Sequence, residues 1–287
     1  MNALEIIRFC YENYSRNNRC PDCKNDCKNS CKQCLEDIHM DRIKRRYNCN
    51  NIIYCYVCRY MLKYMSEFYY LFRNNDELRS LDDYTILSVG CGPCSDLLGI
   101  AHYVGSSRPN VSIKYIGVDL NPYWGNVHAV VDSESKRSNL DIKTKFLQKD
   151  ITEIFNGLGE KTDKLSVNIV TLHYVLSDMV YNAGNIHNFF KDLYNSIISK
   201  MPNGSFIVIN DINHYKARDY FDVFFRMLCG YGWYTCEKYY FDNNLREPHV
   251  YGDKHPSNAL ALEIPAYLHD YDVWNYCSSS QMLIKKM

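Results

Sequence analysis

The sequence has no long apolar run and no excess of one charge. No apolar stretch approaches the roughly 18 residues that a membrane-spanning helix needs, and 33 Lys and Arg balance 33 Asp and Glu. It also has no internal repeat and no low-complexity tract. With 46% apolar residues a packed core is expected, which excludes global disorder. The first residues lack a cationic leader with a small-residue cleavage site. We therefore expect a cytoplasmic protein with no membrane partner.

Overall neutrality hides a difference between the two ends of the chain. Residues 1–80 hold 14 Lys and Arg against 10 Asp and Glu, whereas residues 81–287 hold 19 against 23. Nine of the 14 cysteines lie in the first 58 residues. Large apolar residues recur at three- and four-residue intervals from Cys55 to Phe72, which predicts an amphipathic helix. These shifts predict a small Cys-rich helical module over 1–80 and a larger domain over 81–287.

From residue 84 onward, short β-like runs alternate with helical ones. Strands are expected at 85–90, 112–119, 144–150, 166–173, 205–211, 234–242 and 278–286. Such alternation predicts an α/β fold, namely a seven-stranded, mostly parallel Rossmann-like sheet with helices on both faces. Only the last two strands have no helix between them. Their connection, residues 243–275, is long and contains three prolines, which suggests a lid or substrate-facing loop.

Chemistry-bearing residues follow four of the expected strands. Ligands of open α/β sheets bind beyond the carboxyl ends of the strands. There the sequence places a glycine turn, an acid suited to ribose hydroxyls, an acid followed by an apolar residue suited to an adenine ring, and a His-Tyr pair. These are Gly90 and Gly92, Asp119, Asp150 with Ile151, and His173 with Tyr174. Their order along the chain predicts a nucleotide-type cofactor site.

From Tyr84 to its C-terminus, the chain resembles the class I S-adenosylmethionine-dependent methyltransferases. The resemblance rests on ILSVGCGPCSD, YIGVDLN, LQKDI and NIVTLHYVLSDM, followed by GSFIVINDIN, and it extends to a final antiparallel pair of strands. It implies methyl transfer with S-adenosylmethionine as cofactor. By the resemblance, the methionine end would lie along Gly90, Cys91 and Gly92, the ribose at Asp119 and Leu120, and the adenine between Asp150 and Ile151. A helix before the first strand would roof the cofactor, with Tyr64 and His173 beside it.

The first motif departs from the family at two positions. The family has an acid where this chain has Ser88 and a third glycine where it has Cys94. We expect Asp96 to receive the methionine ammonium instead, and Cys94 to follow the turn with a negative φ. A dinucleotide dehydrogenase fits less well, because a pyrophosphate needs the third glycine for close helix packing. A loop that only supports the fold is the remaining alternative.

Three residues at strand ends are catalytic candidates. His173 could act as a base, Tyr174 could pack on the cofactor, and Asp211 could orient an acceptor. Each could equally be a hydrogen-bonded structural residue. The fourth strand lacks the proline tetrapeptide that would suggest exocyclic amines of bases, so base-amine methylation of DNA is disfavoured.

The early cysteines have the spacing of metal ligands. Two Cys-x-x-Cys pairs with a fifth cysteine between them suit tetrahedral zinc better than an iron–sulfur cluster: Cys20, Cys23, Cys31, Cys34 and Cys27. A second site could combine Cys27 or His39 with Cys49, Cys55 and Cys58. The basic run at 41–48 could bind a nucleic-acid backbone or be a solvated helix face.

We therefore expect an S-adenosylmethionine-dependent methyltransferase acting on RNA or protein, with a structural metal module shaping the acceptor site. A non-catalytic S-adenosylmethionine-binding or interaction module, or a small-molecule methyltransferase, remains open.

Overall fold

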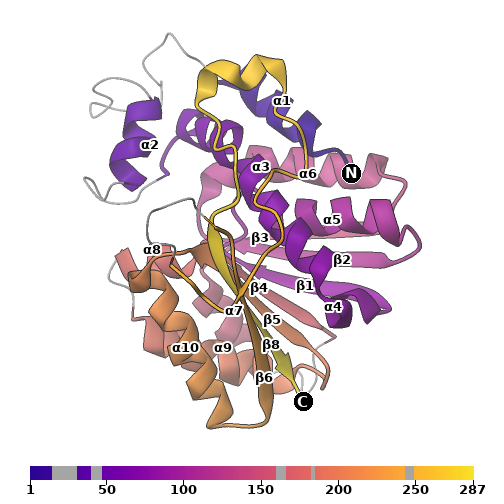
Figure 1. Cartoon of the computed structure of the whole chain (residues 1–287), viewed down its shortest axis with the longest axis vertical. Coiled ribbons are helices and arrows are strands. Elements are labelled where there is room, and N and C mark those ends of the chain that lie inside the picture. The colour runs from indigo at the N-terminus through magenta and orange to yellow at the C-terminus, as the bar shows by residue number, and fades with distance from the viewer. Residues whose placement is uncertain (15–30, 40–46, 160–165, 182–184, 243–248) are drawn as a thin grey trace.

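One sheet with helices on both faces organises the chain (Figure 1). The structure is a computed structural model and describes residues 1–14, 31–39, 47–159, 166–181, 185–242 and 249–287. Its strands are β1 (Asp83–Val89), β2 (Ser112–Asp119), β3 (Ile142–Gln148), β4 (Ile169–His173), β5 (Phe206–Ile212), β6 (Tyr234–Tyr240), β7 (Asp253–Lys254) and β8 (Ser279–Lys286). They lie in the order β3-β2-β1-β4-β5-β8-β6-β7.

The sheet confirms the predicted α/β, mostly parallel Rossmann-like fold. β1 to β5 pair in parallel, and β8 lies antiparallel between β5 and β6. All seven expected strands are present, but the sheet has eight. The additional strand, β7, consists of two residues that pair with the end of β6. A segment this short is below the length at which alternation leaves a pattern.

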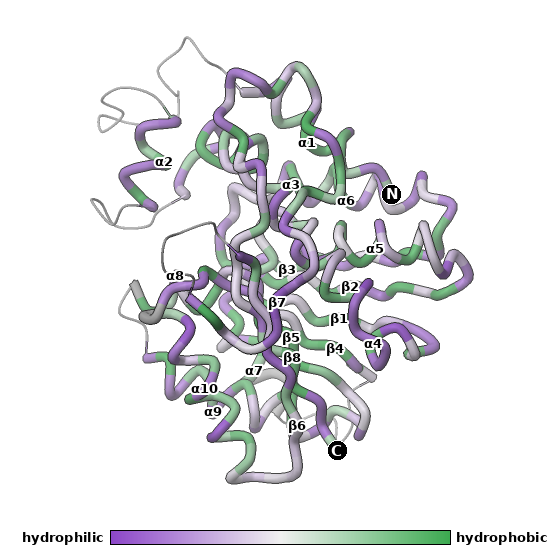
Figure 2. The backbone as a smooth tube through the Cα atoms, in the orientation of Figure 1, coloured by the Kyte–Doolittle hydropathy of each residue, from purple (hydrophilic) through white to green (hydrophobic). Residues whose placement is uncertain are grey.

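Both faces of the sheet are apolar because neighbouring residues of each inner strand point to opposite sides. In β1, Ile86 belongs to one core and Leu87 to the other. Figure 2 shows these inner strands as apolar segments. The first core includes residues of α1 (Ala3–Asn13), α2 (Cys31–His39), α3 (Asn50–Asn74), α5 (Ser95–Ser107) and α6 (Gly125–Arg137). The second includes residues of α7 (Ile151–Gly159), α8 (Leu176–Tyr181), α9 (Ile186–Ser196) and α10 (Tyr215–Cys229).

Helix α3 contains the expected helix over 55–72 and is longer at both ends. Its N-cap, Cys49, accepts a hydrogen bond from the Ile52 N–H through Sγ. Nearly all of α3 is buried, and it packs directly on α5. A Cβ on Gly99 of α5 would lie 2.3 Å from the Met65 carbonyl oxygen, so only glycine permits this approach.

The predicted domain boundary falls between the short helix α4 (Asp76–Ser80) and β1. The first hydrophobic core continues across it, from α1 to β8. The described residues also form three 3-10 helices: η1 (Pro122–Trp124), η2 (Ile198–Lys200) and η3 (Ala266–Tyr271). None of the described helices combines the length and apolarity needed to cross a membrane.

Candidate active site

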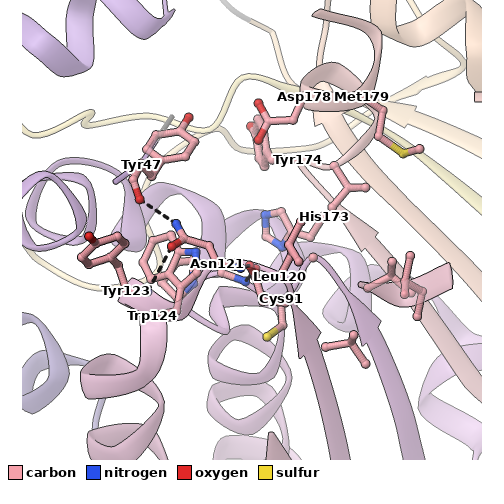
Figure 3. A pocket seen from close by; sticks show the side chains of 18 of the residues that line it. Tyr47, Cys91, Leu120, Asn121, Tyr123, Trp124, His173, Tyr174, Asp178 and Met179 are labelled. Atoms are coloured by element: carbon pink, nitrogen blue, oxygen red, sulfur yellow. Dashed lines mark hydrogen bonds between the residues drawn. The ribbon is translucent and has the colours of Figure 1, made fainter. Parts of the chain in front are cut away.

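A cavity of about 650 Å³ lies at the carboxyl ends of β1, β2, β3 and β4. Each of the four strands is followed by residues that line it, as expected for an open parallel sheet. The roof comes from α3 and from the two residues just before its N-cap (Figure 3). Ten predicted site residues line the cavity: Tyr64, Gly90, Cys91, Gly92, Asp119, Leu120, Asp150, Ile151, His173 and Tyr174.

The turn after β1 needs left-handed backbone at three positions. Gly90 has a φ of 63° and Gly92 a φ of 45°. A Cβ at Gly90 would lie 2.3 Å from Val175 Cγ2, so a side chain here would displace Val175 and also strain the backbone at this positive φ. Cys94 has a φ of 60°, so the expected negative φ is wrong. It is the N-cap of α5 and occupies the backbone region that a third glycine would adopt without steric cost.

Asp119 is tied to that turn by its own carboxylate. Oδ2 accepts a 2.8 Å hydrogen bond from the Gly92 N–H, and Oδ1 accepts one of 2.8 Å from the Asn121 N–H. Burial raises the pKa of Asp119, while these two N–H donors work against that increase. Each carboxylate oxygen can accept a second hydrogen bond. The side chain is therefore fixed in place and retains capacity for hydroxyl donors.

The residues after β3 give the cavity a mixed polar and apolar end. Asp150 accepts hydrogen bonds from the Thr152 N–H (2.9 Å) and hydroxyl (2.8 Å), both at Oδ1. Ile151, the first residue of α7, lines the cavity beside it together with Met179 and Phe189. This combination of one carboxylate and a row of apolar side chains suits a flat ring that carries an amino group.

His173 presents a neutral imidazole to the cavity. Its side chain is 9% exposed and stacks on Phe68 with ring centroids 4.6 Å apart. Among the described residues neither ring nitrogen has a hydrogen-bond partner. Burial, and secondly the charge of Lys63, lower the pKa of His173 well below its usual value. A buried polar group without a partner is costly, and both nitrogens are covered by neighbouring atoms instead of opening onto the cavity.

Tyr174 adopts strained backbone to face α3. Its φ is 57°, which is uncommon for a bulky residue. The ring lies 4.0 Å from that of Tyr64, centroid to centroid, and the hydroxyl donates a 3.0 Å hydrogen bond to Glu67 Oε2. The Lys63 ammonium also contacts this hydroxyl. These contacts, together with the 2.8 Å bond from the Tyr174 N–H to the Asn210 carbonyl, hold the strained conformation.

Glu67 organises the polar layer behind the cavity, and sequence reasoning missed it. The fully buried carboxylate pairs with Lys63 Nζ at 2.8 Å and accepts a 3.0 Å hydrogen bond from Asn210 Nδ2. The backbone N–H groups of Ser278 and Ser279 donate to Oε1 at 3.0 and 3.2 Å. One side chain thus joins α3, β5 and β8. An ion pair one turn apart within an apolar helix is the signal that could have identified it.

Asp96 does not line the cavity, which corrects its expected role at the methionine end. It is buried beneath the turn, where Oδ1 accepts a 2.8 Å hydrogen bond from the Tyr115 hydroxyl and Oδ2 one of 2.6 Å from Thr171 Oγ1. Burial raises its pKa despite these donors. The first turn of α5 points this side chain into the sheet, a direction that sequence proximity to the loop could not reveal.

Asp211 is likewise not at the cavity, so a direct role toward an acceptor does not fit its position. Its carboxylate accepts hydrogen bonds from the Ser177 N–H (3.0 Å) and the Ile212 N–H (2.7 Å). It therefore caps the first turn of α8 and holds the segment that follows His173 and Tyr174. Burial raises its pKa to about 6.

Aromatic side chains form a wall that the sequence analysis did not identify. Tyr47, Tyr123 and Trp124 lie across the cavity from Tyr174 (Figure 3), and Tyr56 also lines the cavity. Asn121 joins two of them, because its Nδ2 donates to the Tyr47 carbonyl at 2.8 Å and its Oδ1 accepts from the Tyr123 N–H at 3.0 Å. The sequence offered one signal, the aromatic pair Tyr123-Trp124. Aromatic pairs have no fixed position relative to the end of a strand, so this pair did not indicate a cavity wall.

The predicted zinc ligands are only partly within the described residues. Cys20, Cys23 and Cys27 lie outside them, and Cys31 and Cys34 are one turn apart in α2. In the described part of the chain, one group of three side chains brings metal-ligating atoms within 4.8 Å of one another, and it consists of Cys91, Cys94 and His128. The expected site in the N-terminal segment stays a prediction.

No family profile matches the sequence, and no curated protein matches it. Among similar solved structures, the plantazolicin methyltransferase BpumL in complex with a monoazolic desmethylPZN analogue and SAH is 13% identical, with a TM-score of 0.42 and 99% of each chain covered. The human methyltransferase 10 domain containing protein is 10% identical, with a TM-score of 0.44 and coverage of 78% of this chain and 82% of that chain. A methyltransferase from Pyrococcus furiosus is 9% identical, with a TM-score of 0.40 and 76% and 83% covered.

Proposed function

We propose that this chain is an S-adenosylmethionine-dependent methyltransferase. The observation that carries the proposal is the convergence of four strand-end sites, in their predicted order, on one cavity. Its volume of about 650 Å³ lies within the range of roughly 300–1,000 Å³ usual for small-molecule sites.

The cavity residues fit the parts of the cofactor in sequence. The turn at Gly90 to Gly92 would hold the methionine end, the carboxylate of Asp119 the ribose hydroxyls, and Asp150 with Ile151 the adenine. When bound, S-adenosylmethionine supplies an electrophilic methyl group on a sulfonium. Tyr64, whose ring packs on Tyr174, closes the cavity from α3.

The chain's own contribution to catalysis would be positioning and proton transfer. A methyl acceptor held close and in line needs little more than correct alignment. His173 borders the cavity as a neutral ring because burial lowers its pKa, and it would accept a proton only where a bound acceptor displaces the side chains that cover its nitrogens. Asp211 would act on this step indirectly, by fixing the start of α8 behind His173.

RNA is the acceptor class that these residues favour over protein. Tyr47 lines the cavity and follows directly on the basic residues Arg42 to Arg46 in sequence. Basic segments bind phosphate backbones, and aromatic rings such as Tyr47 and Trp124 stack on unpaired bases. A protein acceptor, a small molecule and cofactor binding without turnover are the alternative outcomes of the test.

The test is transfer of a radiolabelled methyl group from S-adenosylmethionine into separated RNA, protein and small-molecule fractions of a cell extract. We expect label in RNA that ribonuclease releases, and loss of most of it with His173→Asn. Label in protein or in small molecules would contradict the proposal that RNA is the methyl acceptor. No label in any fraction, together with measurable binding of S-adenosylhomocysteine, would indicate the non-catalytic module.

We also propose that the early cysteines bind structural zinc. Two Cys-x-x-Cys pairs have a spacing that allows four thiolates to bind one tetrahedral zinc ion: Cys20 with Cys23 and Cys31 with Cys34, with Cys27 between the pairs. Metal analysis of protein purified without chelator should find about one equivalent of zinc that Cys20→Ser removes. Zinc-free protein with unchanged folding would overturn this proposal.

A further inference from the structure

The turn that begins α5 contains a Cys-x-x-Cys pair that cofactor binding does not explain. Cys91-Gly92-Pro93-Cys94 connects β1 to α5, and Cys94 is the N-cap of the helix. The proposed cofactor role uses the glycine backbone and requires neither thiol. Two cysteines separated by two residues, placed at a βα turn that starts a helix, are typical of dithiol redox sites.

The geometry of the turn brings the two sulfur atoms together. The Cys94 N–H donates a 2.8 Å hydrogen bond to the Cys91 carbonyl, which closes the turn. Both Sγ atoms and Nε2 of His128 lie within 4.8 Å of one another. A disulfide needs Cβ atoms about 3.5–4.5 Å apart, and side-chain rotation within a closed turn can bring sulfurs this near into bonding distance.

His128 supplies the charge that a reactive thiol requires. Its Nε2 lies 3.5 Å from Cys91 Sγ and 2.8 Å from the Gly92 carbonyl oxygen, which favours a proton on this nitrogen. Burial alone would raise the pKa of the Cys94 thiol, but the hydrogen bond from Cys91 and the charge of His128 outweigh it and lower the pKa to about 7. Burial raises the pKa of Cys91 well above its usual value, so near neutral pH the thiolate of the pair is on Cys94.

We propose that Cys91 and Cys94 form a reversible disulfide when a small hydroperoxide enters the cavity. Cys91 lines the cavity and is 5% exposed, so the oxidant reaches the pair from that side. The thiolate attacks one peroxide oxygen, the O–O bond breaks, hydroxide leaves and a sulfenic acid forms. The second cysteine attacks this sulfur, so the S–S bond forms as water leaves. Two thiols thus lose two protons and two electrons, and hydrogen peroxide becomes two waters. A small dithiol reverses the reaction by exchange.

A second part of the inference rests on the proposed function. Cys91 lies between the two glycines of the turn that would hold the methionine end. An occupied cavity would cover the sulfur and exclude peroxide. The redox state of the pair would then depend on how much cofactor is bound.

The full-length protein provides a direct readout of the pair. The tryptic fragment from Ser80 to Lys114 contains Cys91 and Cys94 and no other cysteine. After hydrogen peroxide treatment and thiol alkylation, we expect mass spectrometry to find this fragment unalkylated and two hydrogen atoms lighter, and dithiothreitol to reverse the change. Cys91→Ser should instead leave a sulfenic acid on Cys94, the residue that carries the thiolate, and dimedone should trap it. His128→Gln should slow oxidation by on the order of tenfold, because the thiolate loses its cation.

A matched control and two opposite results make the test decisive. Cys277 is buried and its Sγ faces backbone carbonyls, so Cys277→Ser should leave the oxidation of the pair unchanged. A fully alkylated fragment after peroxide treatment would overturn the proposal. The proposal would also be overturned if Cys91→Ser and Cys94→Ser each contained one equivalent of zinc less than the wild type. The two cysteines and His128 would then be a metal site.

The cofactor arm separates this inference from the proposed function. Saturating S-adenosylhomocysteine should slow disulfide formation by about tenfold. If S-adenosylhomocysteine binds and the oxidation rate does not change, the inference that a bound cofactor covers the Cys91 sulfur is wrong. Disulfide formation without any binding would uphold the redox pair and contradict the proposed function.

Discussion

At Gly92 and Cys94, one turn holds two residues in left-handed backbone for different reasons. Gly92 lines the cavity, and its N–H holds Asp119 in place. Cys94 faces inward, is fully buried and starts α5. Substitutions at the two positions should therefore have unlike effects, although both occur in the same strained backbone.

Gly92→Asp should weaken binding of S-adenosylhomocysteine by about 100-fold or more, because a side chain at a φ of 45° is strained and its charge lies beside Asp119. Cys94→Gly should change affinity by less than about threefold, since glycine adopts a φ of 60° without steric cost. Calorimetric titration of both variants measures this. Lost binding in Cys94→Gly with intact binding in Gly92→Asp would contradict the assignment of the turn.

Because Asp211 is buried, the free energy of unfolding should change with pH in a direction that can be predicted. Its pKa is raised from 3.8 to about 6 in the folded protein, so between these values the folded state keeps a proton that the unfolded state has lost. Stability from this group is therefore lost as pH rises from about 4 to about 6 and is constant above that. Relative to Asp211→Asn, the wild type should lose on the order of 2 kcal/mol over this interval in urea denaturation. A difference that is flat or increases with pH would contradict the buried, ionisable position.

Residues whose place follows from the end of a strand meet at the cavity, as the sequence predicted. Gly90, Asp119, Asp150 and His173 lie at the carboxyl end of a strand or within two residues of it, and these ends share one edge of the sheet. Asp96 lies one turn inside a helix, so its direction depends on helix phase. Glu67 lies far away in sequence and reaches the site only through the packing of α3, which local patterns do not encode.

Among the elements, the contact between α3 and α5 most strongly constrains the site. It places Tyr64 over the cavity and Glu67 behind it, and it depends on the missing side chain of Gly99. Both helices have strong apolar patterns, so their existence could be predicted. The distance between the two helices could not be predicted, because a glycine within a helical pattern does not show which helix will pack against it.

Gly99→Ala should destabilise the protein by about 1–3 kcal/mol, because the new methyl group would meet the Met65 carbonyl and force the helices apart. Gly105→Ala is the matched control on the same helix. Its Cβ would find only Leu140 Cδ1, at 3.7 Å, so helix propensity should stabilise by about 0.5–1 kcal/mol. Chemical denaturation measures both. Equal effects of the two substitutions would contradict the close packing of α3 on α5.

Sequence periodicity predicted the long elements and missed the short ones. The seven strands and α5, α7 and α10 follow runs of alternating or helical spacing. β7 has two residues and α8 has six, so neither completes a pattern. The helical run that begins at Ile186 ends as α9 at Ser196, and η2 follows it. These differences occur where local hydrogen bonds, such as the Asp211 cap of α8, decide the conformation.

For the whole molecule, the distribution of cysteine and charge predicted a division near residue 80. The hydrophobic core does not follow composition, because α1 and α3 pack on α6 and α5 of the larger region. Composition reports what a segment can bind, while folding depends on which apolar faces meet. The N-terminal segment is therefore expected to be required for folding of the remainder.

A chain of residues 81–287 should fail to unfold cooperatively on heating, because removing α3 exposes the buried face of α5. A chain of residues 47–287, which keeps α3, should still show a cooperative transition. Differential scanning calorimetry of both compares them with the full chain. A cooperative transition in residues 81–287 would show that the two regions fold independently.

The most direct test of the cofactor site is calorimetric titration of the full chain with S-adenosylhomocysteine. We expect one equivalent to bind the wild type, and the affinity of Asp119→Ala to be at least about tenfold lower, because the ribose loses its carboxylate acceptor. Circular dichroism confirms that the variant is folded. No heat of binding to the folded wild type at high protein concentration would contradict the proposed cofactor site.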